Sequence, residues 1–288
     1  MSVQNGAPWG LARISHRRRL GLGTFTKYVH DEKAGEGVDV YVLDSGISTD
    51  HQEFEGRARW GTNVVDGEDD SDANGQGTHL AGIVAGRKYG VAKKATVIAV
   101  KVANASGTVE PKALVKGLEW TAEQAKASGR PSVALIGAAL DKNADLDAAV
   151  NTAANQGLFV VVAAGDFAKD ALDYSPAGAT GAFTVAASTL GDERTYFSNH
   201  GPAVEVFAPG LNIASAYTGS VTEFCSLSGT AQAAAHVAGL GAYLLSTSGD
   251  VTPATVRDAI TVLATPDCLV DVPPSTSNLL AFNNAPDS

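Results

Sequence analysis

The sequence predicts an α/β fold in which a mostly parallel central sheet is flanked by helices. Short apolar runs alternate with helical patterns along the chain, and the runs are rich in Val, Ile and Phe. Nearly continuous apolar runs are typical of strands buried on both faces, and strands separated by helices form parallel sheets through right-handed crossovers. Because no linker or internal repeat interrupts the 288 residues, we expect a single domain over 1–288.

Six segments are expected to be strands, because they concentrate β-branched and aromatic residues between turn-forming residues. These segments are 38–44, 96–102, 132–138, 158–164, 182–187 and 204–207. Five segments with helical patterns are expected to be helices: 77–87, 111–128, 145–156, 230–247 and 252–264. Pro111, Asp145 and Pro253 each stand near a helix start, where proline is tolerated and an acidic residue is favoured.

Two polar segments complete the expected fold. Segment 62–76 is the longest polar stretch and is expected to be a surface loop. The tail, 271–288, is rich in Pro and Asn and is expected to wrap around the surface.

Charge and composition exclude several classes of protein. Lys and Arg total 21 and Asp and Glu total 31, so the net charge of −10 argues against binding to nucleic acid or to an anionic membrane. No apolar run approaches the roughly 18 residues that span a bilayer. Residues 1–15 lack the apolar core of a signal peptide, which leaves localisation open. Cys225 and Cys268 are too few for a zinc site, and both a bridge and two free thiols remain possible.

Three segments place polar residues at the ends of predicted elements. Segment 42–47 puts Asp44 at the end of a buried strand, segment 72–82 (DANGQGTHLAG) enters a helix, and segment 228–239 (SGTAQAAAHVAG) enters a long helix. These segments resemble the three signature blocks of the subtilisin superfamily of serine proteases, with the proteinase K type as the most similar subgroup. The resemblance runs over 5–284 and implies the three-layer fold of that family.

The resemblance also implies catalytic machinery that this sequence has lost at three of four positions. In the family an Asp orients a His, the His takes the proton of a Ser nucleophile, and an Asn helps to bind the oxyanion. Asp44 matches the Asp, but the other positions hold Gln76, Ala231 and Asp166 in that order. Alanine has no attacking oxygen, a neutral amide is no base near pH 7, and a carboxylate would repel an oxyanion.

We therefore expect a pseudoprotease, a non-catalytic binding or regulatory protein that uses a remodelled cleft. One alternative is a repurposed enzyme in which Asp44, Gln76 and Asp166 perform acid–base chemistry on a small molecule, because carboxylates in one cleft can have different pKa values. A second alternative is an engineered inactive protease. Changes next to the catalytic positions disfavour engineering, since Gln232 follows the nucleophile position where the family has Met.

The cleft itself is expected to be altered. The glycine-rich strand that pairs with substrate in the family aligns with residues 137–141, so Leu140 and Asp141 should partly fill or redirect the cleft. The ligand is expected to be a peptide, a protein or a small molecule, bound by a monomer. The expected ligand-binding residues are Ala139, Leu140, Asp141, Gly165, Ser228 and Gln232.

Several side chains have both a functional and a structural interpretation. Asp44 is either a functional carboxylate or a relic of the fold, and Asp166 is either a new acid or base or the product of drift. Gln76 either bonds a ligand or fills the volume of the lost imidazole. His79 and His236 are expected to be buried structural residues.

We expect no cofactor and assign no metal site. The resemblance implies calcium, but the strong calcium site of the family has a carboxylate where Thr189 stands. The acidic run 68–72 is expected to be a solvated loop, because it lacks the EF-hand pattern. The basic run 16–19 is expected to be a solvated turn, with a partner-binding patch as the alternative. Because the chain starts near the mature start of family members, we expect no prodomain.

Overall fold

The computed structural model describes residues 1–286. Its helices are α1 (Trp9–Ile14), α2 (Gln76–Ala85), α3 (Pro111–Ser128), α4 (Ala144–Asn155), α5 (Thr230–Thr247) and α6 (Val256–Leu263), with short 3-10 helices at Gln52–Phe54 and Ala171–Asp173. Its strands are β1 (Ser2–Asn5), β2 (Lys27–His30), β3 (Asp39–Asp44), β4 (Ala58–Asn63), β5 (Thr96–Lys101), β6 (Ser132–Ile136), β7 (Leu140–Asp141), β8 (Phe159–Ala163), β9 (Tyr174–Ser175), β10 (Ala182–Ser188), β11 (Val204–Pro209), β12 (Ile213–Ala216), β13 (Phe224–Leu227), β14 (Thr265–Pro266) and β15 (Leu279–Leu280).

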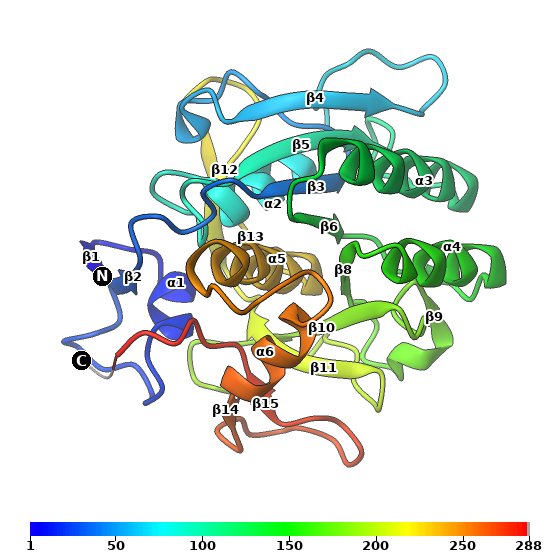
Figure 1. The fold of residues 1–288 in the computed structure, drawn as a ribbon. Helices are drawn as coiled ribbons and strands as arrows, with labels where there is room; N and C mark the ends of the chain where they lie inside the picture. Colours follow the sequence, from blue (N-terminus) through cyan, green and yellow to red (C-terminus); the bar gives the residue numbers. More distant parts are fainter. Residues whose placement is uncertain (287–288) are drawn as a thin grey trace.

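A nine-stranded sheet forms the middle layer, in the order β14-β15-β11-β10-β8-β6-β3-β5-β4. Every neighbouring pair from β15 to β4 is parallel, and β14 is antiparallel to β15. Helices α2 and α5 pack on one face, and α3 and α4 pack on the other (Figure 1). The expected α/β architecture with a mostly parallel sheet is therefore confirmed.

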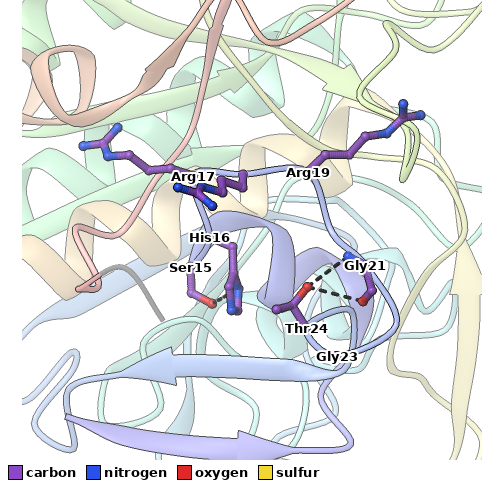
Figure 2. Close-up of a pocket in the computed structure, with 8 residues that line it drawn as sticks. Ser15, His16, Arg17, Arg19, Gly21, Gly23 and Thr24 are labelled. Carbon is purple, nitrogen blue, oxygen red and sulfur yellow. Dashed lines mark hydrogen bonds between the residues drawn. The ribbon is translucent and has the colours of Figure 1, made fainter.

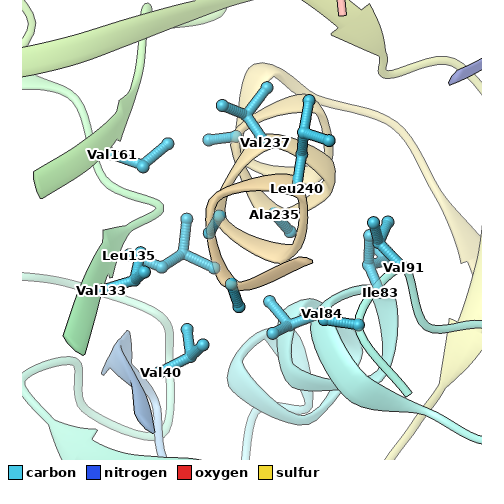
Figure 3. Close-up of a cluster of buried hydrophobic side chains, with 14 of the residues drawn as sticks. Val40, Ile83, Val84, Val91, Val133, Leu135, Val161, Ala235, Val237 and Leu240 are labelled. Carbon is cyan, nitrogen blue, oxygen red and sulfur yellow. The ribbon is translucent and has the colours of Figure 1, made fainter. Parts of the chain in front are cut away.

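The central strands are buried on both faces because their side chains alternate between two apolar clusters. In β3, Val40 and Val42 belong to the cluster under α2 and α5, whereas Tyr41 and Leu43 belong to the cluster under α3 and α4. Figure 3 shows the first cluster, where strand valines face α5. Because both faces of these strands are buried, their sequences are nearly continuous apolar runs.

The register of the strands brings their carboxyl ends to one edge of the sheet. Asp44 at the end of β3 pairs with Lys101 at the end of β5, and Leu43 pairs with Ile136 at the end of β6. Residues that follow these strands therefore lie close together. This edge is where ligands bind in open α/β sheets.

All six expected strands and five expected helices are present; α3 and α5 have the expected bounds, and the other elements have shifted ends. The largest shift is at 252–264, where α6 begins only at Val256 because Thr252 and Thr255 form a turn, with Thr252 N donating to Thr255 Oγ1 at 3.0 Å. The expected loop 62–76 begins inside the edge strand β4. Strands β1, β2, β12 and β13 were not predicted, because they are short and lie outside the main sheet.

The expectation for the tail was wrong in part. Leu279–Leu280 adds β15 to the main sheet, and Phe282 is buried. The tail therefore contributes to the core instead of only covering the surface, while 287–288 lie outside the described residues. Within residues 1–286, no helix combines the length and hydrophobicity that crossing a membrane requires.

Candidate functional site

The candidate site lies at the carboxyl edge of the parallel sheet, between the first turns of α2 and α5. Asp44 ends β3, Asp166 follows β8, and Gln76 and Ala231 lie in the first turns of the two helices. The chain reaches α2 through Gly75, whose φ of 98° is in the left-handed region that favours glycine. The structure thus brings together the ends of four elements that are far apart in sequence.

Asp44 is a buried carboxylate that accepts a single hydrogen bond from the protein. Its side chain is 6% exposed, and its Oδ1 accepts a hydrogen bond from Ser45 N at 2.8 Å. A Cβ placed on Gly137 would lie 2.8 Å from Asp44 Oδ2 and 3.4 Å from the Ala231 Cβ, so a side chain at position 137 would collide with Asp44. Burial raises the pKa of Asp44 to about 7; the Ser45 N–H opposes this shift and the charge of Asp72 adds to it.

Asp72 lies beside this site and holds the start of α2. Its Oδ1 accepts hydrogen bonds from Ser45 Oγ at 2.8 Å and Gly75 N at 2.7 Å, and its Oδ2 accepts one from Thr78 N at 2.9 Å. These bonds satisfy N–H groups that the first turn of a helix leaves unpaired. The expectation of a solvated acidic loop was therefore wrong for Asp72, because its carboxylate is buried as a helix cap.

A buried lysine completes the support behind Asp44. Lys101 is buried at the end of β5, and its Nζ donates to Ser45 O at 3.0 Å and to Ser71 O at 3.1 Å. It also pairs with Glu68 Oε2 at 3.0 Å. Lys101 was not predicted as a site residue, although a lysine that ends an apolar strand is a signal of a paired buried charge.

Gln76 turns toward α5. Its Oε1 accepts a hydrogen bond from Gln232 Nε2 at 3.3 Å, and Gln232 is almost completely buried. The two amides therefore bridge the first turns of α2 and α5. Gln232 thus orients Gln76, and the expected role of Gln232 in binding a ligand stays a prediction.

Asp166 and Ala231 meet at the start of α5. Asp166 Oδ1 accepts a hydrogen bond from Thr230 N at 2.8 Å, which places an acidic group where the helix dipole favours it. Surrounding protein atoms raise the pKa of Asp166, and the Thr230 N–H opposes this shift, while the outer side of the residue stays exposed to solvent. Ala231 is buried, and only its methyl group faces the site.

A cavity of about 240 Å³ opens between Asp44 and the loop that follows β5. Part of its wall is rigid, because Ala103 and Val109 form an isolated antiparallel bridge. The lining residues are Asp44, Asn74, Gln76, Ala103, Gly107, Val109, Gly137 and Ala138.

The lining of this cavity includes none of the expected ligand-binding residues. Leu140–Asp141 forms β7 and pairs with β9, and the Asp141 side chain is exposed. Ala139 packs against Gly165, where an added Cβ would lie 3.2 Å from the Ala139 Cβ. Ser228 is exposed, and its hydroxyl accepts a hydrogen bond from the backbone N–H of residue 212 at 2.9 Å.

The two histidines of the signature segments are buried. A ring nitrogen of His79 lies 3.0 Å from Ile213 O, and a ring nitrogen of His236 lies 2.9 Å from Gln232 O. Burial lowers the pKa of each to about 4, so both are neutral at pH 7. This geometry fits the structural role expected for them.

The donors at the expected calcium position do not fit that ion. Thr189 offers no carboxylate, and its hydroxyl accepts hydrogen bonds from Gly191 N at 3.1 Å and Glu193 N at 3.2 Å. In the described part of the chain, no three His, Cys, Asp or Glu side chains converge as a metal site. Cys225 and Cys268 are both free thiols.

A second cavity, of about 440 Å³, lies at the N-terminal basic run (Figure 2). His16 is buried there, Arg17 Nη1 donates to Leu263 O at 3.0 Å, and the Arg17 guanidinium lies 4.1 Å from the centre of the Phe282 ring. The expectation of a solvated turn was therefore wrong for His16 and Arg17. The arginines in Figure 2 point in different directions, so they do not form a convergent anion site.

Comparison with known proteins identifies the family. A model of the subtilase family matches residues 35–280. The chain belongs to the subtilase family. The subtilisin-like serine protease Pen c 2 of Penicillium citrinum is 48% identical over 307 residues, which cover 100% of this chain and 67% of that protein. Subtilisin-like protease 8 of Arthroderma benhamiae is 47% identical over 302 residues, which cover 98% of this chain and 62% of that protein.

A solved structure extends the match to three dimensions. The crystal structure of a cold adapted subtilisin-like serine proteinase is 35% identical, has a TM-score of 0.90, and covers 98% of this chain and 100% of its own. The expected subtilisin-like, proteinase K-like peptidase fold is thus confirmed. This subtilase chain spans about two thirds or less of the length of the curated relatives above. Their names describe those proteins as proteases, whereas the activity of this chain depends on its own residues.

Proposed function

We propose that this subtilase-family chain binds a peptide or protein segment in its cleft without cleaving it. The observation that carries the proposal is the chemistry of the side chains at positions 76 and 231, beside Asp44. Position 231 presents a methyl group beside Asp44 and Gly137, and the amide at position 76 is bound to Gln232. The methyl group at position 231 cannot attack a carbonyl, and the neutral amide at position 76 cannot accept the proton of a nucleophile.

Asp166 supports the same proposal. Its carboxylate accepts the Thr230 N–H at the start of α5, where a protease of this family would stabilise an oxyanion. A second negative charge is disfavoured there. In subtilisin itself, loss of the Ser or the His costs about 10⁶-fold in kcat. The changes at 76, 166 and 231 together leave no route to peptide hydrolysis above background.

Hydrolysis and binding assays test this proposal. The purified chain should not cleave fluorogenic peptides or casein and should not be labelled by a fluorophosphonate, yet extended peptides should bind and raise its thermal midpoint. Replacement of Gly137 with valine provides the control for binding in the cleft, because an added side chain there would collide with Asp44. Hydrolysis by the wild-type chain that is lost in Asp44→Ala would refute the proposal.

One observation favours a second candidate function. Asp44 has a pKa of about 7, in the range of a general acid or base, and the pKa of Asp166 is also raised. Acid–base chemistry on a small molecule is therefore the alternative. A metabolite screen with Asp44→Asn and Asp166→Asn would detect it: turnover that both variants lose supports an enzyme, and turnover that both retain excludes these residues.

A further inference from the structure

We propose that the cavity beside Asp44 binds an alkylammonium group, such as a lysine side chain, with the ammonium on Asp44 Oδ2. This inference rests on the proposed binding function and specifies the chemistry of one pocket in the same site. Its basis is the free oxygen of Asp44, the shape and polarity of the cavity, and the charges around it.

The Asp44 carboxylate is buried but only half satisfied. Oδ1 accepts the Ser45 N–H, whereas Oδ2 receives no hydrogen bond from any residue within 1–286. The nearby ammonium of Lys101 is already bound to Ser45 O, Ser71 O and Glu68, behind the strand end. Asp44 lines the open cavity, so this oxygen is reached from the solvent side, and a charged donor that enters the cavity would form a charge-assisted hydrogen bond with it.

Gln76 leaves this oxygen accessible. Although Gln76 lines the same cavity, its side-chain oxygen is bound by Gln232 from α5. This bond orients the Gln76 amide toward α5, and no hydrogen bond joins Gln76 to Asp44 within residues 1–286. The Asp44 oxygen is therefore accessible with Gln76 in this orientation.

The cavity fits one aliphatic side chain with a cationic end. At about 240 Å³ it is smaller than the roughly 300–1,000 Å³ of pockets for drug-sized ligands. Ala103, Val109 and Ala138 give it apolar walls, which suit the methylene stem of a lysine. An arginine needs two acceptor oxygens in one plane, but Asp44 offers one, so the geometry favours an ammonium.

The charges around Asp44 favour a cation. Asp72 lies behind Ser45, Asp166 lies at the start of α5, and the positive charge of Lys101 is paired with Glu68. Because burial raises the pKa of Asp44 to about 7, the carboxylate is mostly neutral at pH 6 and mostly ionised at pH 8. Binding of an ammonium should therefore strengthen by about tenfold from pH 6 to pH 8.

Calorimetric titration of two blocked peptides tests the inference: acetyl-Ala-Lys-Ala-amide and its norleucine analogue, both in 0.15 M salt. At pH 8 the lysine peptide should bind at least tenfold more tightly, and this preference should nearly vanish at pH 6. Asp44→Asn should abolish the preference, because the amide keeps the size but lacks the charge. Asp50→Asn removes an exposed charge elsewhere and should leave the preference intact.

A cavity-filling variant and a small probe separate this inference from the proposed function. Ala138→Leu should weaken the binding of n-butylammonium, and n-butanol should bind wild-type protein far less well. Equal binding of both peptides would overturn the lysine assignment and leave peptide binding intact. A lysine preference that survives in a folded Asp44→Asn variant, or no binding of either peptide or of butylammonium, would also overturn it.

Discussion

Asp44 and Asp72 lie on either side of Ser45 and are about equally buried, at 6% and 5% exposed, yet their surroundings differ sharply. Asp72 accepts five hydrogen bonds, from Ser45, Asn74, Gly75 and twice from Thr78. Asp44 accepts one, from Ser45 N. One carboxylate is fully used in building the fold, and the other keeps a free oxygen that faces a cavity.

This contrast distinguishes the scaffold of the site, which Asp72 stabilises, from its chemistry, which depends on the free oxygen of Asp44. The bonds of Asp72 fix the start of α2, and hence the position of Gln76, whatever residue stands at position 231. The free oxygen of Asp44 receives no bond from Gln76, whose side-chain oxygen is bound by Gln232. Asp44 lines the cavity with the oxygen that no residue of the described chain bonds, which is the geometry that a ligand would use.

The largest expected effect tests whether the scaffold is still organised for catalysis. The triple variant Gln76→His, Ala231→Ser, Asp166→Asn restores a base, a nucleophile and an oxyanion donor around an unchanged Asp44. We expect peptide hydrolysis at least about 10³-fold faster than in Ala231→Ser alone, because the nucleophile and the base act as a unit. Initial rates with a fluorogenic peptide provide the measurement.

The single variants are the controls for this experiment. Ala231→Ser without a base should remain near background and should not react with a fluorophosphonate. If the folded triple variant is equally inactive, the backbone around Asp44 is no longer aligned for catalysis, and the separation of scaffold from chemistry is wrong.

The second effect tests how much the hydrogen bonds of Asp72 stabilise the fold. Asp72→Ala removes the acceptor of five hydrogen bonds at the start of α2, and it leaves the Ser45 hydroxyl and the N–H groups of Gly75 and Thr78 without this partner. We expect a loss of about 4 kcal/mol in the free energy of unfolding, as for other broken buried networks. Urea denaturation measures it, with the exposed Asp70→Ala as the matched control that should change stability by less than about 0.5 kcal/mol.

The sequence predicted the parts of the fold that are buried on both sides. Strand β3, with its run of Val, Tyr and Leu, is recognisable because both of its faces contact apolar clusters. Strand β4 is half-exposed, contains Gly61 and lies at the sheet edge, so its pattern is too weak to identify. Strand β15 has two residues and is stabilised by long-range pairing alone.

Site residues were predictable when they belong to a local sequence motif, and they were not when their role depends on partners that are distant in sequence. Asp44 and Ala231 occur in local motifs, so the sequence placed them correctly at element ends. The role of Asp72 was hidden within an acidic run, and its partners Ser45 and Thr78 are distributed over two segments. The pairing of Gln76 with Gln232 spans 156 positions and leaves no local pattern.

The third effect concerns pH and tests the free oxygen of Asp44. The pKa of Asp44 is about 7 in the folded protein and near 3.8 when unperturbed, so the folded state binds the proton more tightly. Stability should therefore decline as pH rises from about 4 to about 7, by roughly 3 kcal/mol in total. Asp44→Asn retains an acceptor for Ser45 N and lacks this decline.

The measurement is urea denaturation of both proteins between pH 4 and pH 8. Asp44→Asn should match the wild-type protein at pH 4 and exceed its stability by about 3 kcal/mol at pH 8. A constant difference across this range would show that Asp44 does not titrate as its burial predicts.

The smallest effect tests why the Asp44 oxygen is free. Gln232→Met keeps a long unbranched side chain at the same buried position but removes the donor to Gln76, whose bond is long at 3.3 Å. Because that bond is weak, unfolding should change by less than about 1 kcal/mol. A released Gln76 can turn its amide N–H toward Asp44 Oδ2 and compete with a ligand ammonium. The preference for the lysine peptide should therefore fall several-fold while stability stays nearly constant, and an unchanged preference would mean that Gln232 does not control access to Asp44.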